Sequence, residues 1–150
     1  MDGKFEETFE DIMKFVESNY RIKATKENRA IAGLSMGGYH TSNISRYYPN
    51  TFDYMGLFSP ALNNKPEQYP TAPAYQNLDK NLKRQMSDGY KLYWIAVGKD
   101  DVPILFNAIK DYRAKLDSMD MKYEYVETEG GHTWSNWRDY LTTFAQRLFK

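Results

Sequence analysis

A serine between two glycines is the residue of this sequence best suited to covalent chemistry. Gly33-Leu34-Ser35-Met36-Gly37 has the pattern G-x-S-x-G, in which a serine sits on a sharp turn between a strand and a helix. The apolar run Ala30-Ile31-Ala32 precedes the pattern, and a helix-like segment over 38–48, ended by Pro49, follows it. We expect a strained turn at Ser35, with glycines on either side because a Cβ there would collide with neighbouring backbone. A glycine-rich turn with an incidental serine is the alternative, and the flanking elements favour a nucleophile.

A serine hydroxyl needs a base within hydrogen-bonding reach to act as a nucleophile near neutral pH. The sequence has two histidines, His40 and His132. His132 lies in a glycine-rich turn after the predicted strand 122–127, and the carboxyl ends of parallel strands meet at one edge of a sheet. His40 lies in the helix that leads away from that edge. We therefore predict His132 as the base and His40 as a partly buried structural residue.

A carboxylate that orients the base is expected from a third loop at the same edge. The predicted strand 91–97 runs into Gly98-Lys99-Asp100-Asp101, and spacing alone admits either aspartate. Both could instead be turn or N-cap residues of the next helix. The order serine, aspartate, histidine along the chain is the order found in α/β-hydrolases. The backbone N–H of Met36, at a helix start, is the expected donor to the oxyanion of an acyl-transfer reaction.

Two further residues at this edge are candidates for contact with a substrate. Ser59 follows the predicted strand 52–58, and Trp134 follows His132 by two positions. An alternative for Trp134 is that its ring anchors the His132 loop to the final helix.

The predicted helices and strands alternate, which indicates a parallel α/β sheet in a single domain over residues 1–150. Apolar residues at three- and four-residue spacing over 5–20 predict an amphipathic first helix. The predicted strands are 29–34, 52–58, 91–97 and 122–127, and the later helices are 38–48, 76–86, 103–116 and 135–149.

The composition argues against several classes of partner and site. Lys+Arg and Asp+Glu number 20 each, so the formal net charge is zero. The charge therefore gives no indication of nucleic acid or a membrane surface as a partner. No apolar run approaches the ~18 residues of a membrane span, and the absence of cysteine excludes disulfides and thiolate metal sites. Residues 1–7 are too acidic and polar for a signal peptide. The compartment is left open, and a secreted or periplasmic parent protein is compatible with the sequence.

Three stretches of the sequence resemble an esterase family. They are 32–39 around the serine, 97–101 around the aspartates, and Gly130-Gly131-His132-Thr133-Trp134 with the residues up to 138. The family contains esterase D, the feruloyl and acetyl xylan esterases of carbohydrate esterase family 1, and enterochelin esterases. In its feruloyl esterase-like branch the acid is the second aspartate, which falls on Asp101. The resemblance implies hydrolysis of feruloyl or acetyl esters of plant polysaccharide through an acyl-serine, without a metal or organic cofactor.

The resemblance also implies a partial α/β-hydrolase fold, because family members carry much of their sheet ahead of the nucleophile. This sequence has room there for one helix. We therefore expect the C-terminal part of the fold, a mostly parallel four-stranded sheet flanked by helices, with the N-terminal strands and the second oxyanion donor absent. Strand 29–34 would then be an open edge. We expect self-association there, most simply as a two-fold dimer, or poor solubility.

Two other functions are compatible with these patterns. One is a non-catalytic fragment or binding module that keeps the fold without turnover. The other is a peptidase domain of the prolyl oligopeptidase type, which shares the serine turn. The Gly-Gly-His-Thr-Trp stretch at 130–134 favours an esterase over a peptidase.

Overall fold

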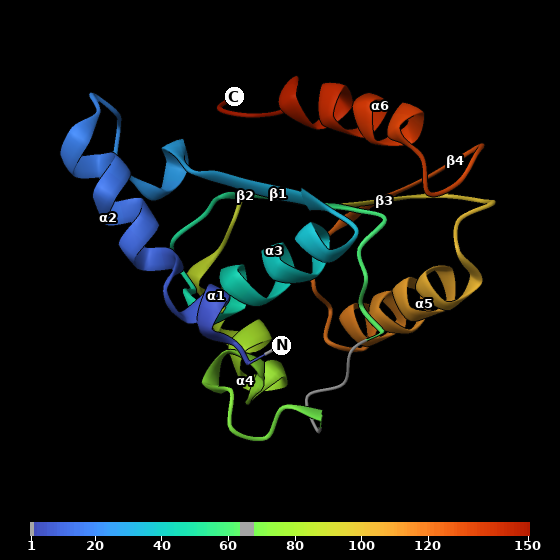
Figure 1. Ribbon diagram of the computed structural model, residues 1–150, viewed down its shortest axis with the longest axis horizontal. Coiled ribbons are helices and arrows are strands. Elements are labelled where there is room, and N and C mark those ends of the chain that lie inside the picture. The colour runs from blue at the N-terminus through green and yellow to red at the C-terminus, as the bar shows by residue number, and fades with distance from the viewer. Residues whose placement is uncertain (1, 64–67) are drawn as a thin grey trace.

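Four parallel strands form one sheet in the computed structural model, which describes residues 2–63 and 68–150. The strand order across the sheet is β1-β2-β3-β4, the same as the order along the chain. This arrangement confirms the predicted parallel sheet and leaves β1 at one edge (Figure 1). The strands are β1 (Ala30–Leu34), β2 (Tyr54–Phe58), β3 (Leu92–Gly98) and β4 (Glu124–Thr128).

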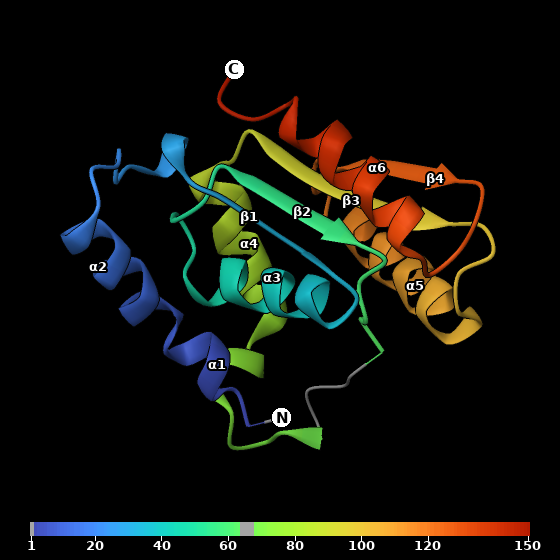
Figure 2. The same cartoon turned by 45° about the horizontal axis from the view of Figure 1, so that its top comes forward.

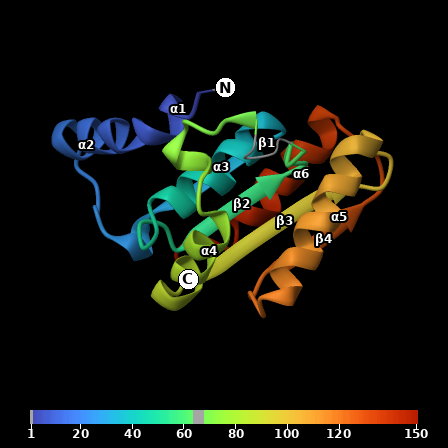
Figure 3. The same cartoon turned by 90° about the horizontal axis from the view of Figure 1, so that it is seen from below.

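Helices cover the two faces of the sheet unequally. Helix α6 lies on one face, whereas α3, α4 and α5 lie on the other (Figures 1 and 3). No helix in the described ranges is long and apolar enough to cross a bilayer. The helices are α1 (Lys4–Glu7), α2 (Phe9–Asn19), α3 (Met36–Tyr47), α4 (Leu78–Asp88), α5 (Pro103–Ser118) and α6 (Trp134–Ala145), with 3-10 turns η1 (Lys26–Asn28) and η3 (Pro73–Tyr75).

The central strands β2 and β3 are buried along their whole length, because helices cover them on both sides. Successive side chains of a strand point to opposite faces. Met55 and Leu57 therefore join the core under α3, α4 and α5, whereas Tyr54 and Phe58 join a second, aromatic core under α6. This two-sided burial explains why both strands read as apolar runs in the sequence.

The N-terminal helix differs from the prediction of one helix over 5–20. The chain forms α1 and α2, and the helix is interrupted at Thr8, whose hydroxyl donates to the carbonyl of Lys4 at 2.7 Å. Helix α2 buries none of its residues completely, and Phe15 is 62% exposed. The described residues therefore leave much of the apolar side of α2 uncovered. Figure 2 shows α1 and α2 lying beyond the β1 edge of the sheet.

Apolar grooves flank β1 on both sides. A groove of about 370 Å³ lies between β1 and α2, with Ile12, Val16 and Ile31 in its walls. A second groove of about 230 Å³ lies between β1 and α6, with Leu34 and Leu141 in its walls. Within residues 2–63 and 68–150, β1 pairs with β2 alone. Its outer edge is therefore open, and the surface on both sides of that edge is apolar.

Candidate functional site

Ser35 occupies the turn that joins β1 to α3. Its φ of 52° and ψ of −117° are strained for a residue with a side chain. Its N–H donates to the carbonyl of Phe58 at 2.9 Å, and its carbonyl accepts from the N–H of Ala61 at 2.9 Å. These bonds tie the turn to the carboxyl end of β2 and hold the strained backbone in place.

The glycines around Ser35 are crowded differently from the prediction. A Cβ on Gly33 would overlap the backbone carbonyl of Gly37, and a Cβ on Gly38 would lie 2.7 Å from Cβ of Pro60. A Cβ on Gly37 would meet nothing within 4 Å. The prediction that both glycines of the pattern are sterically required was therefore wrong for Gly37. The second crowded position is Gly38, because α3 packs there against the loop after β2.

The structure brings Ser35, His132 and Asp101 together in one chain of hydrogen bonds. The Oγ of Ser35 lies 3.0 Å from Nε2 of His132, and Nδ1 of His132 lies 2.9 Å from Oδ1 of Asp101. An ionised carboxylate can only accept a hydrogen bond, so Nδ1 carries the hydrogen and donates it to Asp101. The Nε2 atom is then free to accept the proton of the serine hydroxyl.

The two adjacent aspartates occupy different environments. The side chain of Asp101 is fully buried, and its Oδ1 also accepts the N–H of Val102 at 2.7 Å. Its Oδ2 has no hydrogen-bond partner in the described part of the chain. Asp100 is exposed, and its N–H donates to the carbonyl of Gly130 at 2.9 Å. The tertiary structure therefore selects Asp101, between two aspartates that spacing alone admits, as the partner of His132.

Two loops in backbone contact hold the acid and the base. The N–H of Lys99 donates to the carbonyl of Thr128 at 2.8 Å, parallel to the bond between Asp100 and Gly130. A Cβ on Gly131 would lie 2.5 Å from the carbonyl oxygen of Asp100. A side chain at Gly131 would push the two loops apart, so this glycine lets the His132 loop approach Asp101 closely.

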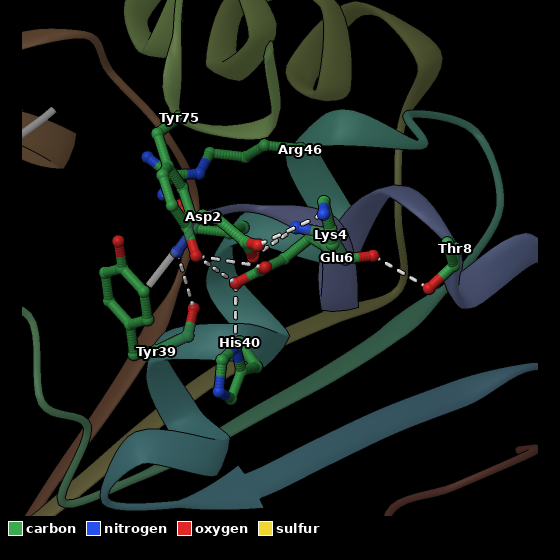
Figure 4. Close-up of polar contacts among 9 residues, drawn as sticks. Asp2, Lys4, Glu6, Thr8, Tyr39, His40, Arg46 and Tyr75 are labelled. Carbon is green, nitrogen blue, oxygen red and sulfur yellow. Dashed lines mark hydrogen bonds and ion pairs between the residues drawn. The ribbon is translucent and has the colours of Figure 1, made fainter. Parts of the chain in front are cut away.

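His40 lies outside this constellation, as predicted, and its side chain is 25% exposed. Its Nδ1 is 2.7 Å from Oε1 of Glu6, a side chain that is almost fully buried (Figure 4). The hydroxyl of Tyr75 donates to the same carboxylate, 3.0 Å from each oxygen. Burial, and next the hydrogen bond to Glu6, raise the pKa of Tyr75. The cluster of Glu6, His40 and Tyr75 fastens α1 to α3 and η3.

The other predicted site residues are Met36, Trp134 and Ser59, and they differ in exposure. Met36 begins α3, where backbone N–H groups have no acceptor within the helix. Trp134 is 70% exposed at the start of α6. Ser59 is fully buried, and its Oγ has no hydrogen-bond partner among the described residues. A hydroxyl enclosed in this way does not reach a substrate, so the structure leaves Ser59 outside the open site.

Trp137 was not among the site residues predicted from the sequence. Its ring packs perpendicular to the imidazole of His132, with ring centres 4.8 Å apart, and edge-on to Trp134 at 5.2 Å. The spacing of three between the two tryptophans on a helix was the available signal, because such residues share a face. No group of three or more His, Asp or Glu side chains in the described ranges could hold a metal ion.

Comparison with known proteins identifies the family to which the sequence belongs. A family model described as "Putative esterase" matches residues 7–148. The chain belongs to this esterase family. It is 33% identical to an endo-1,4-beta-xylanase/feruloyl esterase of Xylanibacter ruminicola, covering 99% of this chain and 19% of that protein. It is 30% identical to an acetyl esterase of Caldicellulosiruptor saccharolyticus, covering 93% of this chain and 61% of that protein.

Solved structures show the same fold as this esterase-family chain. A carbohydrate esterase family 1 ferulic acid esterase from Anaeromyces mucronatus superposes with a TM-score of 0.75 at 23% identity, covering 97% of this chain and 53% of the other. An S-formylglutathione hydrolase from Staphylococcus aureus superposes with a TM-score of 0.75 at 19% identity, covering 96% and 62%. The chain has the α/β-hydrolase architecture of these enzymes and spans less than two thirds of their length.

Proposed function

We propose that this chain carries the catalytic triad of a serine carboxylic-ester hydrolase. Ser35 is the nucleophile, His132 the general base and Asp101 the acid that orients it. The observation that carries the proposal is the continuous hydrogen-bond chain from Oγ of Ser35 through His132 to Asp101, at 3.0 and 2.9 Å, on a strained turn. A lone serine turn does not require such an arrangement, whereas acyl transfer does.

The reaction proceeds in two symmetrical halves. In the first, Oγ of Ser35 attacks the ester carbonyl carbon while Nε2 of His132 takes the hydroxyl proton. The tetrahedral intermediate collapses, the alcohol leaves with the proton from His132, and an acyl-serine remains. In the second half, water attacks the acyl-serine and gives a proton to His132. Collapse then releases the carboxylic acid and returns the proton to Ser35.

Charge that develops along this path is stabilised at two places. In this mechanism the backbone N–H of Met36, at the positive end of α3, donates to the oxyanion of each tetrahedral intermediate. The Asp101 carboxylate stabilises the imidazolium of His132, and its complete burial strengthens that interaction.

We infer that the substrates are feruloyl or acetyl esters of plant polysaccharide. The names of the two curated relatives, a xylanase/feruloyl esterase and an acetyl esterase, support this choice over a peptide substrate. Trp134 exposes a large aromatic surface two residues from the base, which suits contact with an aromatic acyl group or a sugar ring.

We further infer that a second copy of the 150-residue chain is its partner along the open edge of β1. Unpaired N–H and C=O groups on an edge strand are a template for a further strand. The apolar grooves on both sides of β1 support this inference.

A fluorophosphonate probe tests the triad, because only an activated serine reacts with it. We expect the wild-type chain to be labelled at Ser35 and to hydrolyse aryl acetate or methyl ferulate. Ser35→Ala should lose both activities at an unchanged melting temperature. Ser87→Ala, on an exposed turn of α4, is the matched control and should behave like wild type. A folded wild-type chain that takes up no label would contradict the proposal and favour a non-catalytic binding module.

A further inference from the structure

The side chain of Asn136 lies directly behind the loop that carries His132. Asn136 is on the first turn of α6 and is 8% exposed. The loop runs from the end of β4 at Thr128 to the N-cap of α6 at Thr133. The side-chain amide of Asn136 is therefore close to both ends of the loop, at Thr128 and at the N-cap residue Thr133.

The polar atoms of the Asn136 side chain are bonded to both ends of this loop. Its Nδ2 donates to the carbonyl of Glu129 at 2.7 Å and to Oγ1 of Thr128 at 3.1 Å. Its Oδ1 accepts from the hydroxyl of Thr133 at 2.7 Å. A third contact of Nδ2, to the hydroxyl of Tyr140 at 3.3 Å, ties the same group to the body of α6.

The loop backbone is shaped to fit against this amide. Gly130 has a φ of +80°, and a Cβ built on it would lie 2.7 Å from Oδ1 of Asn136. The carbonyl of Gly130 accepts from Asp100, and the carbonyl of Gly131 accepts from the N–H of Thr133 at 2.8 Å. Asn136 and the β3–α5 turn thus hold the loop from two sides, with His132 between its fixed points.

We propose that Asn136 is a positioning residue for His132 in ester hydrolysis. This inference rests on the proposed function, because it assigns a role relative to that reaction. The hydrogen bonds of the Asn136 side chain go to Thr128, Glu129, Thr133 and Tyr140, not to the serine or the imidazole, so it acts through the loop. Since reacting groups must be held within about 0.5 Å of their productive geometry, a loop freed at Thr128 and Glu129 would lose the contact between His132 and Ser35.

The arrangement requires an amide in particular. Glu129 offers a carbonyl, which needs a donor, whereas Thr133 offers a hydroxyl hydrogen, which needs an acceptor. Aspartate has the shape of asparagine but no N–H to donate. Asn136→Asp therefore keeps the volume and the bond from Thr133 while removing the bonds to Thr128 and Glu129.

The test combines hydrogen exchange with labelling of Ser35. In Asn136→Asp we expect the amide protons of Asp100 and Thr133 to exchange at least about tenfold faster, with the amides of β2 and β3 unchanged. We expect fluorophosphonate labelling to slow by about 10²-fold, with KM for a small ester little changed. The downfield NMR signal of the His132 Nδ1 hydrogen should also broaden or disappear.

Two further variants make the test specific. Thr128→Val keeps the shape of threonine but removes one acceptor of the Asn136 amide, so it should shift the same readouts in the same direction. Asn43→Asp is the matched control. Asn43 is also buried, in α3, and its Nδ2 donates to the carbonyl of Tyr39 at 3.0 Å, away from the loop. It should leave loop exchange and labelling near wild type.

Different results would contradict the positioning role of Asn136 and the proposed esterase function. A wild-type chain with a protected loop but no labelling would count against the proposed function. Loop exchange in Asn136→Asp equal to wild type, or faster exchange throughout the molecule, would overturn the positioning role. If Asn136→Asp does not fold, Thr128→Val decides the question by the same measurements.

Discussion

In the proposed mechanism, Ser35 depends on residues from two other loops for its reactivity. The base reaches it from the loop after β4, and the acid reaches the base from the turn after β3. The acid is fully buried and the base is 23% exposed, so a proton can reach the imidazole while its counter-charge stays shielded. The three residues of the proposed triad come from three separate segments of the chain, so each can be substituted and tested separately.

The neighbouring aspartates provide the first test. Asp101→Asn should lower kcat/KM by about 10³- to 10⁴-fold, because an amide at Nδ1 favours the wrong tautomer of His132 and does not stabilise the imidazolium. Asp100→Asn should stay close to wild type, since Asp100 contacts the His132 loop through its backbone. Steady-state kinetics on an aryl ester measure both. The reverse result would assign the acid to Asp100.

Trp134 provides the second test at this scale. Trp134→Phe should change the ratio of activity on feruloyl and acetyl esters at a constant melting temperature, because the ring is 70% exposed and contributes little to the core. Trp137→Phe is the comparison and should slow both esters, because its ring supports His132. If Trp134→Phe instead lowered the melting temperature with unchanged ester preference, the ring would be an anchor.

At the scale of elements, the turn between β1 and α3 is closely packed and held by hydrogen bonds. Ser35 is fixed to the end of β2 by its own backbone, and α3 starts so close to β1 that Gly33 lies against the carbonyl of Gly37. A similar approach of backbones joins the β3–α5 turn to the loop after β4.

The two glycines of the serine turn should respond oppositely to alanine. Gly33→Ala should lower the free energy of unfolding by about 1–3 kcal/mol, because its methyl group would overlap the backbone of α3. Gly37→Ala should raise it by roughly 0.5–1 kcal/mol, because the site is open and alanine favours a helix. Urea unfolding measures both. Destabilisation by Gly37→Ala would show that the open space is not available in solution.

At the scale of the whole molecule, apolar surface gathers on the β1 side. The core under α3, α4 and α5 is continuous with the groove between β1 and α2, where Ile12 and Val16 remain 48% and 36% exposed. Burying such a surface stabilises an association by roughly 25 cal/mol for each Å² of apolar area removed from water.

We expect the 150-residue chain to form a two-fold dimer along β1, or to be poorly soluble, at micromolar concentration. Sedimentation velocity measures the assembly state. Ala32→Lys places a charge on the exposed middle of β1 and should shift the population towards monomer. Ser87→Lys, on α4, should not. A wild-type chain that sediments as a stable monomer would contradict the prediction.

The sequence by itself determined the parallel sheet and the meeting of Ser35 with His132 at its carboxyl edge. The reason is that strand, turn and helix signals are local, and parallel strands send all their C-terminal loops to one side. Ser35 follows from its G-x-S-x-G turn, and His132 follows from its place in a loop at that edge, whereas His40 lies in a helix. The expectation that Asp101 rather than Asp100 is the acid came from the family resemblance, because both aspartates follow the same strand.

The tertiary structure decided what depends on neighbours distant in the sequence. The contact of α3 with the loop after β2 made Gly38 rather than Gly37 the crowded glycine. Burial at the end of β2, beside β3, removed Ser59 from the open site. Similarly, only the folded loop shows that Trp137 supports the imidazole and that Asn136 bonds both loop ends. Side-chain packing depends on contacts between residues far apart in the sequence, and local periodicity does not encode these contacts. The same local pattern is compatible with a position open to solvent and with one filled by a neighbouring element.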